Sequence, residues 1–185
     1  MRILTEKTST ASPKVLPPIS IGTLSSTPIG PLWIALSDLG IVVVDWSMPQ
    51  VDFIHRIRQR FNTNAIVDDV LTAEPLRQIS EYLSGKRREF DLTIDLSGMT
   101  QFQVNVLKLT LDIPYGQITT YKEIASRHGN PCAARAVGLV EALNPIPLLI
   151  PCHRVIGSDG SLHGYGGPGG IKLKSWLLNL EQRKD

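Results

Sequence analysis

The stretch Leu149-Ile150-Pro151-Cys152-His153-Arg154-Val155-Ile156 sets one of the chain's two cysteines beside a histidine, with apolar residues on both sides. A thiol is a weak nucleophile until it loses its proton, and a neighbouring imidazole or cation lowers its pKa from a free value of about 8.5. A buried structural cysteine is the common alternative. Here His153 and Arg154 require a polar cavity or water, which favours a nucleophilic Cys152. The apolar residues 146–150 predict a short buried strand that delivers this cysteine.

Length and composition limit the class of protein. At 185 residues, with 42% hydrophobic and 19% charged residues, the chain has an ordinary globular composition and can bury one good core or two small ones. Its apolar runs are too short to cross a bilayer, and the N-terminus lacks the apolar core of a signal peptide. Two cysteines form one disulfide at most, and a free thiol in a reducing compartment is the better interpretation. We therefore expect a cytoplasmic protein without membrane contact.

The net charge of +2 is unevenly distributed. Residues 1–99 carry 10 Lys and Arg against 11 Asp and Glu, whereas residues 100–185 carry 9 against 6. A basic second half is compatible with contact to nucleic-acid phosphates, although a solvated surface would look the same.

The first half has the pattern of a small α/β domain. We expect a mobile tail over 1–18, where periodicity is lacking, and an N-terminal domain over 19–96. Short apolar runs separated by Pro, Gly and Asp turns predict antiparallel strands at 19–24, 32–36 and 41–46. Periodicity predicts helices at 50–61 and 74–84 and a half-buried strand at 90–96.

The second half, 97–185, is predicted to be a mostly helical domain. Capping signals predict helices that begin after Thr100, Thr120 and Asn130, and periodicity predicts a last helix at 171–183. The fold class that follows is α/β (α+β). It combines a small N-terminal domain, with an antiparallel sheet and helices, and a helical C-terminal domain that holds the active-site cysteine.

The helices expected at 120–128 and 131–143 have the spacing of a helix-turn-helix, although plain helical packing is the commoner cause of such spacing. The second helix carries a single arginine, Arg135, among small residues, which are Ala133, Ala134, Ala136 and Gly138. Small residues let a helix approach another backbone closely, and one arginine among them suits a narrow electronegative groove. We therefore expect this helix to bind the minor groove of DNA.

The chain carries, in order, the run from Gly129 to Gly138, the segment Asn144-Pro145-Ile146-Pro147 and the Pro-Cys-His-Arg motif at 151–154 with aliphatic flanks. Together these resemble the O6-alkylguanine-DNA alkyltransferase family, over residues 100–182 and more weakly from residue 27. The resemblance implies a methylated-DNA–[protein]-cysteine S-methyltransferase. Such a suicidal DNA repair protein flips O6-alkylguanine, notably O6-methylguanine, out of the duplex. It moves the alkyl group irreversibly to its cysteine, in a single turnover that inactivates the protein and restores guanine.

The resemblance implies a role for each catalytic residue. Cys152 would attack the alkyl carbon by in-line displacement, and His153 would assist through a turn or a bridging water. Glu181 would hold the tautomer of the histidine and support its charge. Tyr121 would donate a hydrogen bond to the leaving guanine, and Asn144 would bond the region of the thiol.

The resemblance also implies contacts to DNA and substrate. Arg135 would fill the gap left in the base stack, and the other DNA contacts would come from Ala133, Ala134, Ala136, Gly138 and Tyr121. The substrate pocket would include Arg154, Val155, Tyr165 and Gly166. We expect no metal and no cofactor, because the sequence has no ligand cluster, P-loop or dinucleotide fingerprint. The expected partner is double-stranded DNA, bound by a monomer, and cooperation between chains on DNA is left open.

Some features depart from the family pattern or leave another function open. The loop from Gly166 to Gly170 is two residues longer than usual, and Gly166 offers a backbone amide where some relatives offer a hydroxyl, so the range of alkyl groups is left open. The N-terminal half has no cysteine for a thiolate zinc site. Cys132 is interpreted as a surface thiol. The set of Cys152, His153 and Glu181 would also serve a cysteine hydrolase, which turns over repeatedly, whereas a non-catalytic lesion-binding relative would lack the cysteine.

Overall fold

The computed structural model describes residues 1–4, 17–166 and 169–183. Contacts between residues divide it into two units, Met1–Gly98 and Met99–Asp185, each with its own core. The division lies two residues beyond the boundary that the sequence suggests between 96 and 97. All of the predicted catalytic residues lie in the second unit.

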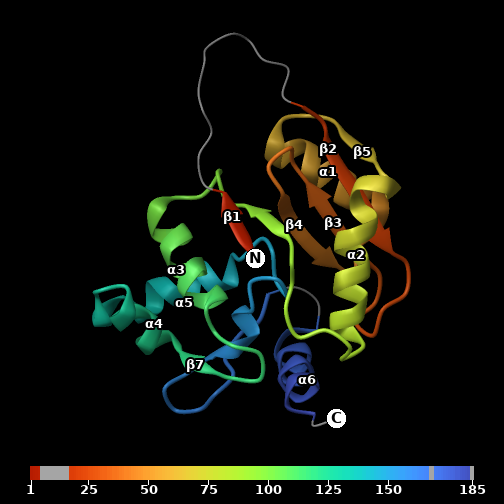
Figure 1. Ribbon diagram of the computed structural model, residues 1–185. Coiled ribbons are helices and arrows are strands. Elements are labelled where there is room, and N and C mark those ends of the chain that lie inside the picture. Colours follow the sequence, from red (N-terminus) through yellow and green to blue (C-terminus); the bar gives the residue numbers. More distant parts are fainter. Residues whose placement is uncertain (5–16, 167–168, 184–185) are drawn as a thin grey trace. The chain divides into compact units, whose positions relative to one another are not determined.

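The first unit is built on a six-stranded sheet with the order β1-β6-β4-β3-β2-β5 (Figure 1). Its strands are β1 (Arg2–Leu4), β2 (Ile19–Leu24), β3 (Leu32–Leu36), β4 (Ile41–Trp46), β5 (Ala65–Val67) and β6 (Thr93–Asp95). Strands β2, β3 and β4 pair antiparallel, with Ile21 opposite Ala35 and Ile34 opposite Val44. The sequence predictions for these three strands are confirmed, because short turns and local alternation encode them.

The remaining strands differ from the sequence predictions. The tail expected over 1–18 is wrong at β1, which pairs in parallel with β6, Arg2 lying opposite Thr93. Residues 5–16 of that tail lie outside the described residues. The strand expected over 90–96 is limited to β6, and the sequence analysis does not predict β5. Strands of three residues are too short to show a period of two, and their partners are distant in the sequence.

Helix α1 (Gln50–Phe61) packs on one face of this sheet and matches its predicted bounds. Its buried Phe53 and Ile57 join a core cluster that includes Ile21 of β2, and the ring of Phe53 stacks on Trp33 at a centroid distance of 5.7 Å. The helical spacing of its apolar residues therefore predicts this face correctly.

Helix α2 (Asp69–Leu83) packs on the other face, against β2 (Figure 1). It begins five residues before the predicted 74, because the Asp68 side chain caps two backbone N–H groups of its first turn. The helix crosses β2 at Gly22, where an added Cβ would lie only 2.2 Å from the Thr72 hydroxyl oxygen. Glycine is required at this crossing, since any side chain would push the helix off the sheet.

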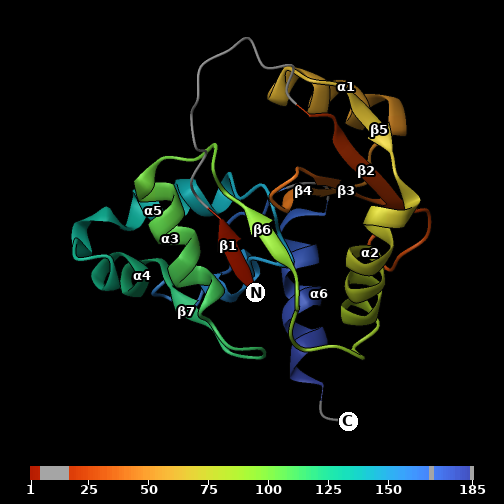
Figure 2. The ribbon, with the colours of Figure 1, turned by 45° about the horizontal axis from the view of Figure 1, so that its top comes forward.

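The second unit is mostly helical, as predicted (Figure 2). Its helices are α3 (Gln101–Leu111), α4 (Tyr121–Arg127), α5 (Ala134–Ala142) and α6 (Gly170–Gln182), with 3-10 turns η1 (Pro131–Ala133) and η2 (Cys152–Arg154). Strands β7 (Thr119–Thr120) and β8 (Val155–Ile156) form a short parallel pair. Helices α3, α4 and α5 lie together. Among the described helices, none is long and apolar enough to span a membrane.

Both predicted capping boxes form. The Gln103 side chain accepts a hydrogen bond from the Thr100 N–H at 2.9 Å, and the Thr100 hydroxyl accepts from the Gln103 N–H. Thr120 and Glu123 repeat the arrangement at the start of α4. The second box makes Tyr121 the first residue of α4. It therefore fixes the backbone position from which the Tyr121 side chain projects.

The helix expected from residue 131 starts as the 3-10 turn η1 and becomes α helical only at Ala134. Asn130 caps the turn as predicted, because its side-chain oxygen accepts from the Cys132 N–H at 3.1 Å. Gly129, with φ of +93°, turns the chain between α4 and this segment. Helices α4 and α5 pack against each other across that turn.

The buried strand expected at 146–150 is wrong. This segment is a turn in which Leu148 has φ of 73°, and a single bridge joins Pro147 to Ile150. Pro147 and Pro151 have no backbone N–H to give to a sheet, so burial of the apolar residues does not produce a strand. The turn leads directly to Cys152.

Candidate active site

Cys152 is the first residue of η2 and is 6% exposed. Burial and then the nearby Glu141 raise the pKa of its thiol to about 12, although a hydrogen bond with the Asn144 side chain and the charge of Lys174 act in the opposite direction. The thiol is therefore protonated in the protein without substrate, and it needs a base to become a nucleophile.

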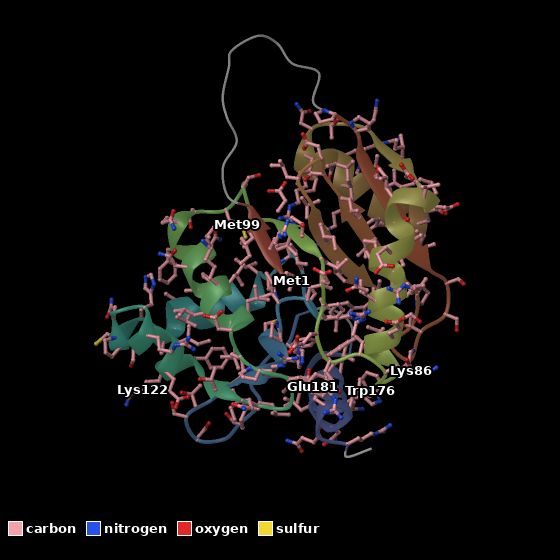
Figure 3. The ribbon with its side chains drawn as sticks, in the orientation of Figure 1. Met1, Lys86, Met99, Lys122, Trp176 and Glu181 are labelled. Carbon is pink, nitrogen blue, oxygen red and sulfur yellow. The ribbon has the colours of Figure 1, made fainter. Side chains whose placement is uncertain are left out.

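The side chains of His153 and Glu181 meet in the interior of the second unit. His153 Nε2 lies 2.8 Å from Glu181 Oε1, and both side chains are fully buried. Arg154 donates to the same carboxylate from Nη2 at 2.8 Å and from Nε at 3.0 Å, and the Gly116 N–H donates at 2.9 Å. The carboxylate projects from α6, on which Glu181 is labelled (Figure 3). It thus ties η2 to α6.

The protonation state of this pair follows from its contacts. Burial alone would raise the pKa of Glu181, but hydrogen bonds from His153 and Arg154 outweigh burial and hold the pKa well below its usual range. Burial lowers the pKa of His153, against the attraction of Glu181. An ionised carboxylate only accepts hydrogen bonds, so Nε2 carries the histidine proton and Nδ1 is the basic nitrogen. The residue that follows Cys152 in the sequence, His153, therefore carries a neutral imidazole.

Asn144 holds the turn that precedes the thiol. Its Nδ2 donates to the Ile150 carbonyl at 2.9 Å, and its Oδ1 accepts from the Ile146 N–H at 3.0 Å. The same side chain hydrogen-bonds Cys152. Asn144 follows α5 closely in the chain, so it joins the end of that helix to the cysteine.

Cys152 lines a cavity of about 510 Å³, which lies within the range of roughly 300–1,000 Å³ typical of ligand pockets. The structure brings seven predicted site residues to its wall: Tyr121, Ala134, Arg135, Gly138, Cys152, Tyr165 and Gly166. Lys122 also lines it and points outward from α4 (Figure 3). Residues 167 and 168 of the longer loop lie outside the described residues.

The cavity wall, over the described residues, leaves out Ala133, Ala136, Val155 and Arg154. The expectation that Val155 and Arg154 form the substrate pocket is corrected, because neither residue belongs to the wall of this cavity. The guanidinium of Arg154 donates hydrogen bonds to the Glu181 carboxylate and, from Nη1 at 2.6 Å, to the Ile113 carbonyl. A buried arginine needs such partners, so Arg154 supports the carboxylate instead of facing substrate.

Comparison with known proteins places this site in a family. The description "6-O-methylguanine DNA methyltransferase, DNA binding domain" matches residues 101–183, and the description "6-O-methylguanine DNA methyltransferase, ribonuclease-like domain" matches residues 21–96. The chain belongs to the 6-O-methylguanine DNA methyltransferase family.

Similar relatives support the family assignment over most of the chain. A methylated-DNA–protein-cysteine methyltransferase of Methanosarcina barkeri is 43% identical, over 84% of this chain and 93% of that protein. An inducible one of Bacillus subtilis is 40% identical, over 82% of this chain and 84% of that protein. A crystal structure of Mycobacterium tuberculosis OGT in complex with DNA matches with a TM-score of 0.73 and 38% identity, covering 88% of this chain and 92% of that one. The resemblance and the mixed α/β fold inferred from the sequence are thereby confirmed.

The site of this methyltransferase also contains a buried lysine that the sequence analysis does not single out. Lys174 donates from Nζ to the carbonyls of Val155 and Leu162, both at 2.6 Å, and lies 3.4 Å from the Tyr121 hydroxyl. Burial, then Glu141 and Cys152, raise the pKa of Tyr121 to about 12, so the phenol stays a hydrogen-bond donor. Lys174 lies on the same buried face of α6 as Leu177 and Glu181. A lysine on the apolar face of a predicted helix is the feature of the sequence that could have identified it.

Glu141 is the second residue that the sequence analysis misses. It lies on the inner stripe of α5 beside Val137 and Val140, is 5% exposed, and its Oε1 is 2.5 Å from the Thr110 hydroxyl. Burial raises the pKa of Glu141 to about 7, although the Thr110 bond and the charge of Lys174 oppose the rise. A glutamate on the apolar face of a predicted helix is again the feature of the sequence that could have identified it.

Glu141→Gln is expected to stabilise the protein at alkaline pH and to have little effect in mild acid. The unfolded chain releases the Glu141 proton near pH 4.5, whereas the folded chain keeps it to about pH 7. Folded stability therefore falls as pH rises through this window and stays lowered above it. At about 1.4 kcal/mol per pKa unit, the variant gains up to about 3 kcal/mol at alkaline pH. Urea unfolding on both sides of the window measures the gain, and an equal shift on both sides would contradict it.

Proposed function

We propose that this methyltransferase repairs DNA by transferring the alkyl group of O6-alkylguanine, notably O6-methylguanine, to Cys152. The thiolate attacks the alkyl carbon, the S–C bond forms as the C–O6 bond breaks, and the electron pair leaves with guanine. Each chain acts once and irreversibly. The observation that carries the proposal is a buried thiol on the wall of a ligand-sized cavity, next in sequence to the histidine of a buried His–Glu pair.

The protons of this reaction are assigned to side chains at the site. His153 takes the thiol proton, directly or through a water, and Glu181 keeps its tautomer and stabilises the imidazolium that forms. Tyr121, on the cavity wall, donates a hydrogen bond to the guanine anion, which then takes a proton from solvent. Gly166 offers its backbone amide to the guanine oxygen. The reaction balances in this form without metal or cofactor.

The partner is double-stranded DNA, approached through its minor groove by α5. A relative with 38% identity has been crystallised with DNA, and Arg135 is exposed here on a helical segment of small residues. One chain supplies every assigned residue, so a monomer suffices. The two free cysteines suit the reducing cytoplasm, where we expect the protein to act.

The decisive experiment follows a label. Duplex DNA that contains O6-methylguanine with a labelled methyl group is incubated with the protein, and peptide mass spectrometry locates the label. We expect one equivalent per chain, on Cys152. Sustained turnover by one chain would identify a hydrolase instead, and a label on Cys132 would move the reaction to another residue.

Arg135→Ala is expected to slow repair of duplex DNA strongly and to have little effect on transfer from free O6-benzylguanine. Flipping costs a few kcal/mol in unstacking and unpairing, and an intruding side chain offsets part of that cost by holding the gap. The free base needs no flipping. Single-turnover rates with both substrates measure the difference.

Two companion variants sharpen this test. Arg135→Lys should be intermediate, because the charge survives and the planar stacking surface does not. Arg127→Ala removes an exposed cation from α4, in the same unit, and should slow duplex repair much less. Equal losses of Arg135→Ala on DNA and on the free base would show that Arg135 supports the fold or the thiol.

A further inference from the structure

Glu141 is a buried acid in the same cavity as the reactive thiol. It lines the cavity together with Cys152 and Tyr121. Its Oε1 meets the Thr110 hydroxyl at 2.5 Å, and its Oε2 is buried without a hydrogen-bond partner among the residues that the structure describes. A charged carboxylate in such a place would leave one oxygen desolvated and uncompensated, which is costly.

The contacts of Thr110 indicate that Glu141 is neutral. The hydroxyl of Thr110 lies 3.0 Å from the Val106 carbonyl and 2.5 Å from Glu141 Oε1. A hydroxyl has one proton, and a carbonyl only accepts. If Thr110 gives its proton to Val106, the proton between Thr110 and Glu141 belongs to the acid. Both contacts are then satisfied at once.

Polar and charged groups from several elements interact with Glu141 or share its cavity wall. Thr110 from α3 and Lys174 from α6 interact with it, and the wall adds Tyr121 and Lys122 from α4, Arg135 from α5, Cys152 from η2, and His163 and Tyr165 from the loop that follows β8. The charges of Glu141 and Lys174 act on the thiol in opposite directions, the acid opposing the thiolate and the lysine favouring it. Glu141, the thiol and Lys174 thus place two acids and one cation in a low dielectric, where like charges repel strongly.

We infer that Glu141 is a positioning residue that controls the charge of Cys152: its neutral acid permits the thiolate, and its carboxylate opposes it. The inference rests on Cys152 as the alkyl acceptor proposed above. While Glu141 keeps its proton, the charge of Lys174 is available to stabilise the thiolate. Once Glu141 ionises, the lysine compensates the carboxylate instead, and the thiol becomes harder to ionise. The two titrations are coupled, so each acid shifts the other.

Glu141→Gln tests this coupling, because glutamine keeps the shape and the hydrogen-bonding capacity of the acid and cannot ionise. The rate of Cys152 alkylation by iodoacetamide is followed by peptide mass spectrometry, in a Cys132→Ser background, from mildly acidic to alkaline pH. Wild type and variant should react equally in acid, where the side chain at position 141 is uncharged in both. At alkaline pH the variant should react about tenfold faster, the change in thiolate that one pKa unit produces.

Two further variants serve as controls. Glu123→Gln removes an exposed carboxylate of the same unit and preserves its capping box, which glutamine also forms, so it should match wild type at every pH. When Glu141 ionises, the Thr110 hydroxyl can turn its proton from the Val106 carbonyl to the carboxylate, in a stronger charge-assisted bond. Thr110→Val removes that bond and should move the onset of the difference to higher pH. This second route keeps the inference testable if the glutamine variant does not fold.

The outcomes separate this inference from the proposed function. If wild-type protein transfers one methyl equivalent to Cys152 and the glutamine variant shows no pH-dependent gain, the charge control is wrong and the repair function stands. A constant ratio of rates at all pH values would show a merely structural effect and would also overturn the inference. If wild-type protein transfers no methyl group, the proposed function fails, and the inference that rests on it fails too.

Discussion

Cys152→Ala is expected to abolish alkyl transfer and to leave binding of lesion-containing duplex nearly intact. The thiol is the only group assigned to bond with the alkyl carbon, so no slower route remains when it is removed. A buried cysteine packs as a small hydrophobe, and alanine fills most of the same volume. Transfer is measured with a labelled methyl group, and binding is measured by fluorescence anisotropy of a duplex containing O6-methylguanine.

The second cysteine provides the matched control. Cys132 is exposed at the first turn after Asn130, and Cys132→Ser should transfer as much label as wild type. Methylation of Cys132 in the Cys152→Ala variant would show that the wrong thiol has been assigned. Loss of duplex binding in that variant would instead show that the cysteine supports the fold.

The elements that the sequence predicts well are those with local signals. The hairpins from β2 to β4 have short turns and apolar runs, and both capping boxes lie within four consecutive residues. Strands β1 and β5 depend on partners far away in the sequence, and no local pattern identifies a three-residue strand. The segment 146–150 is misread because its apolar residues are buried in a turn, and burial alone does not determine backbone conformation.

The residues of the site also divide into those that a local sequence signal identifies and those that it does not. A motif singles out Cys152 and His153, and the family resemblance adds Glu181, which lies 2.8 Å from His153 across 28 residues of sequence. Glu141 and Lys174 are missed because their effect on the thiol comes from burial of two ionisable side chains in a shared interior, and only the structure shows that they share it. Both nevertheless occupy apolar helical stripes, which is the pattern to look for in a sequence.

Glu181→Gln is expected to lower the unfolding free energy by about 3–5 kcal/mol at neutral pH, since removing one partner of a buried ion pair leaves an uncompensated charge. The carboxylate accepts from His153, from two nitrogens of Arg154 and from the Gly116 N–H. A glutamine offers one oxygen to these donors and turns an NH₂ group toward the rest. Alkyl transfer should slow by at least about a hundredfold, because the base loses the group that holds its tautomer.

The pH dependence of the lost unfolding free energy tests whether the charge of the Glu181 carboxylate is the cause. Contacts with His153 and Arg154 hold the pKa of Glu181 below its value of 4.5 in the unfolded chain, so the stability that it contributes is complete above pH 4.5 and is lost as pH falls below it. Urea unfolding of wild type and Glu181→Gln should therefore show a wide gap at neutral pH that narrows in acid. A gap that stays constant down to strongly acidic pH would mean that shape, and not the charge of the carboxylate, holds η2 to α6.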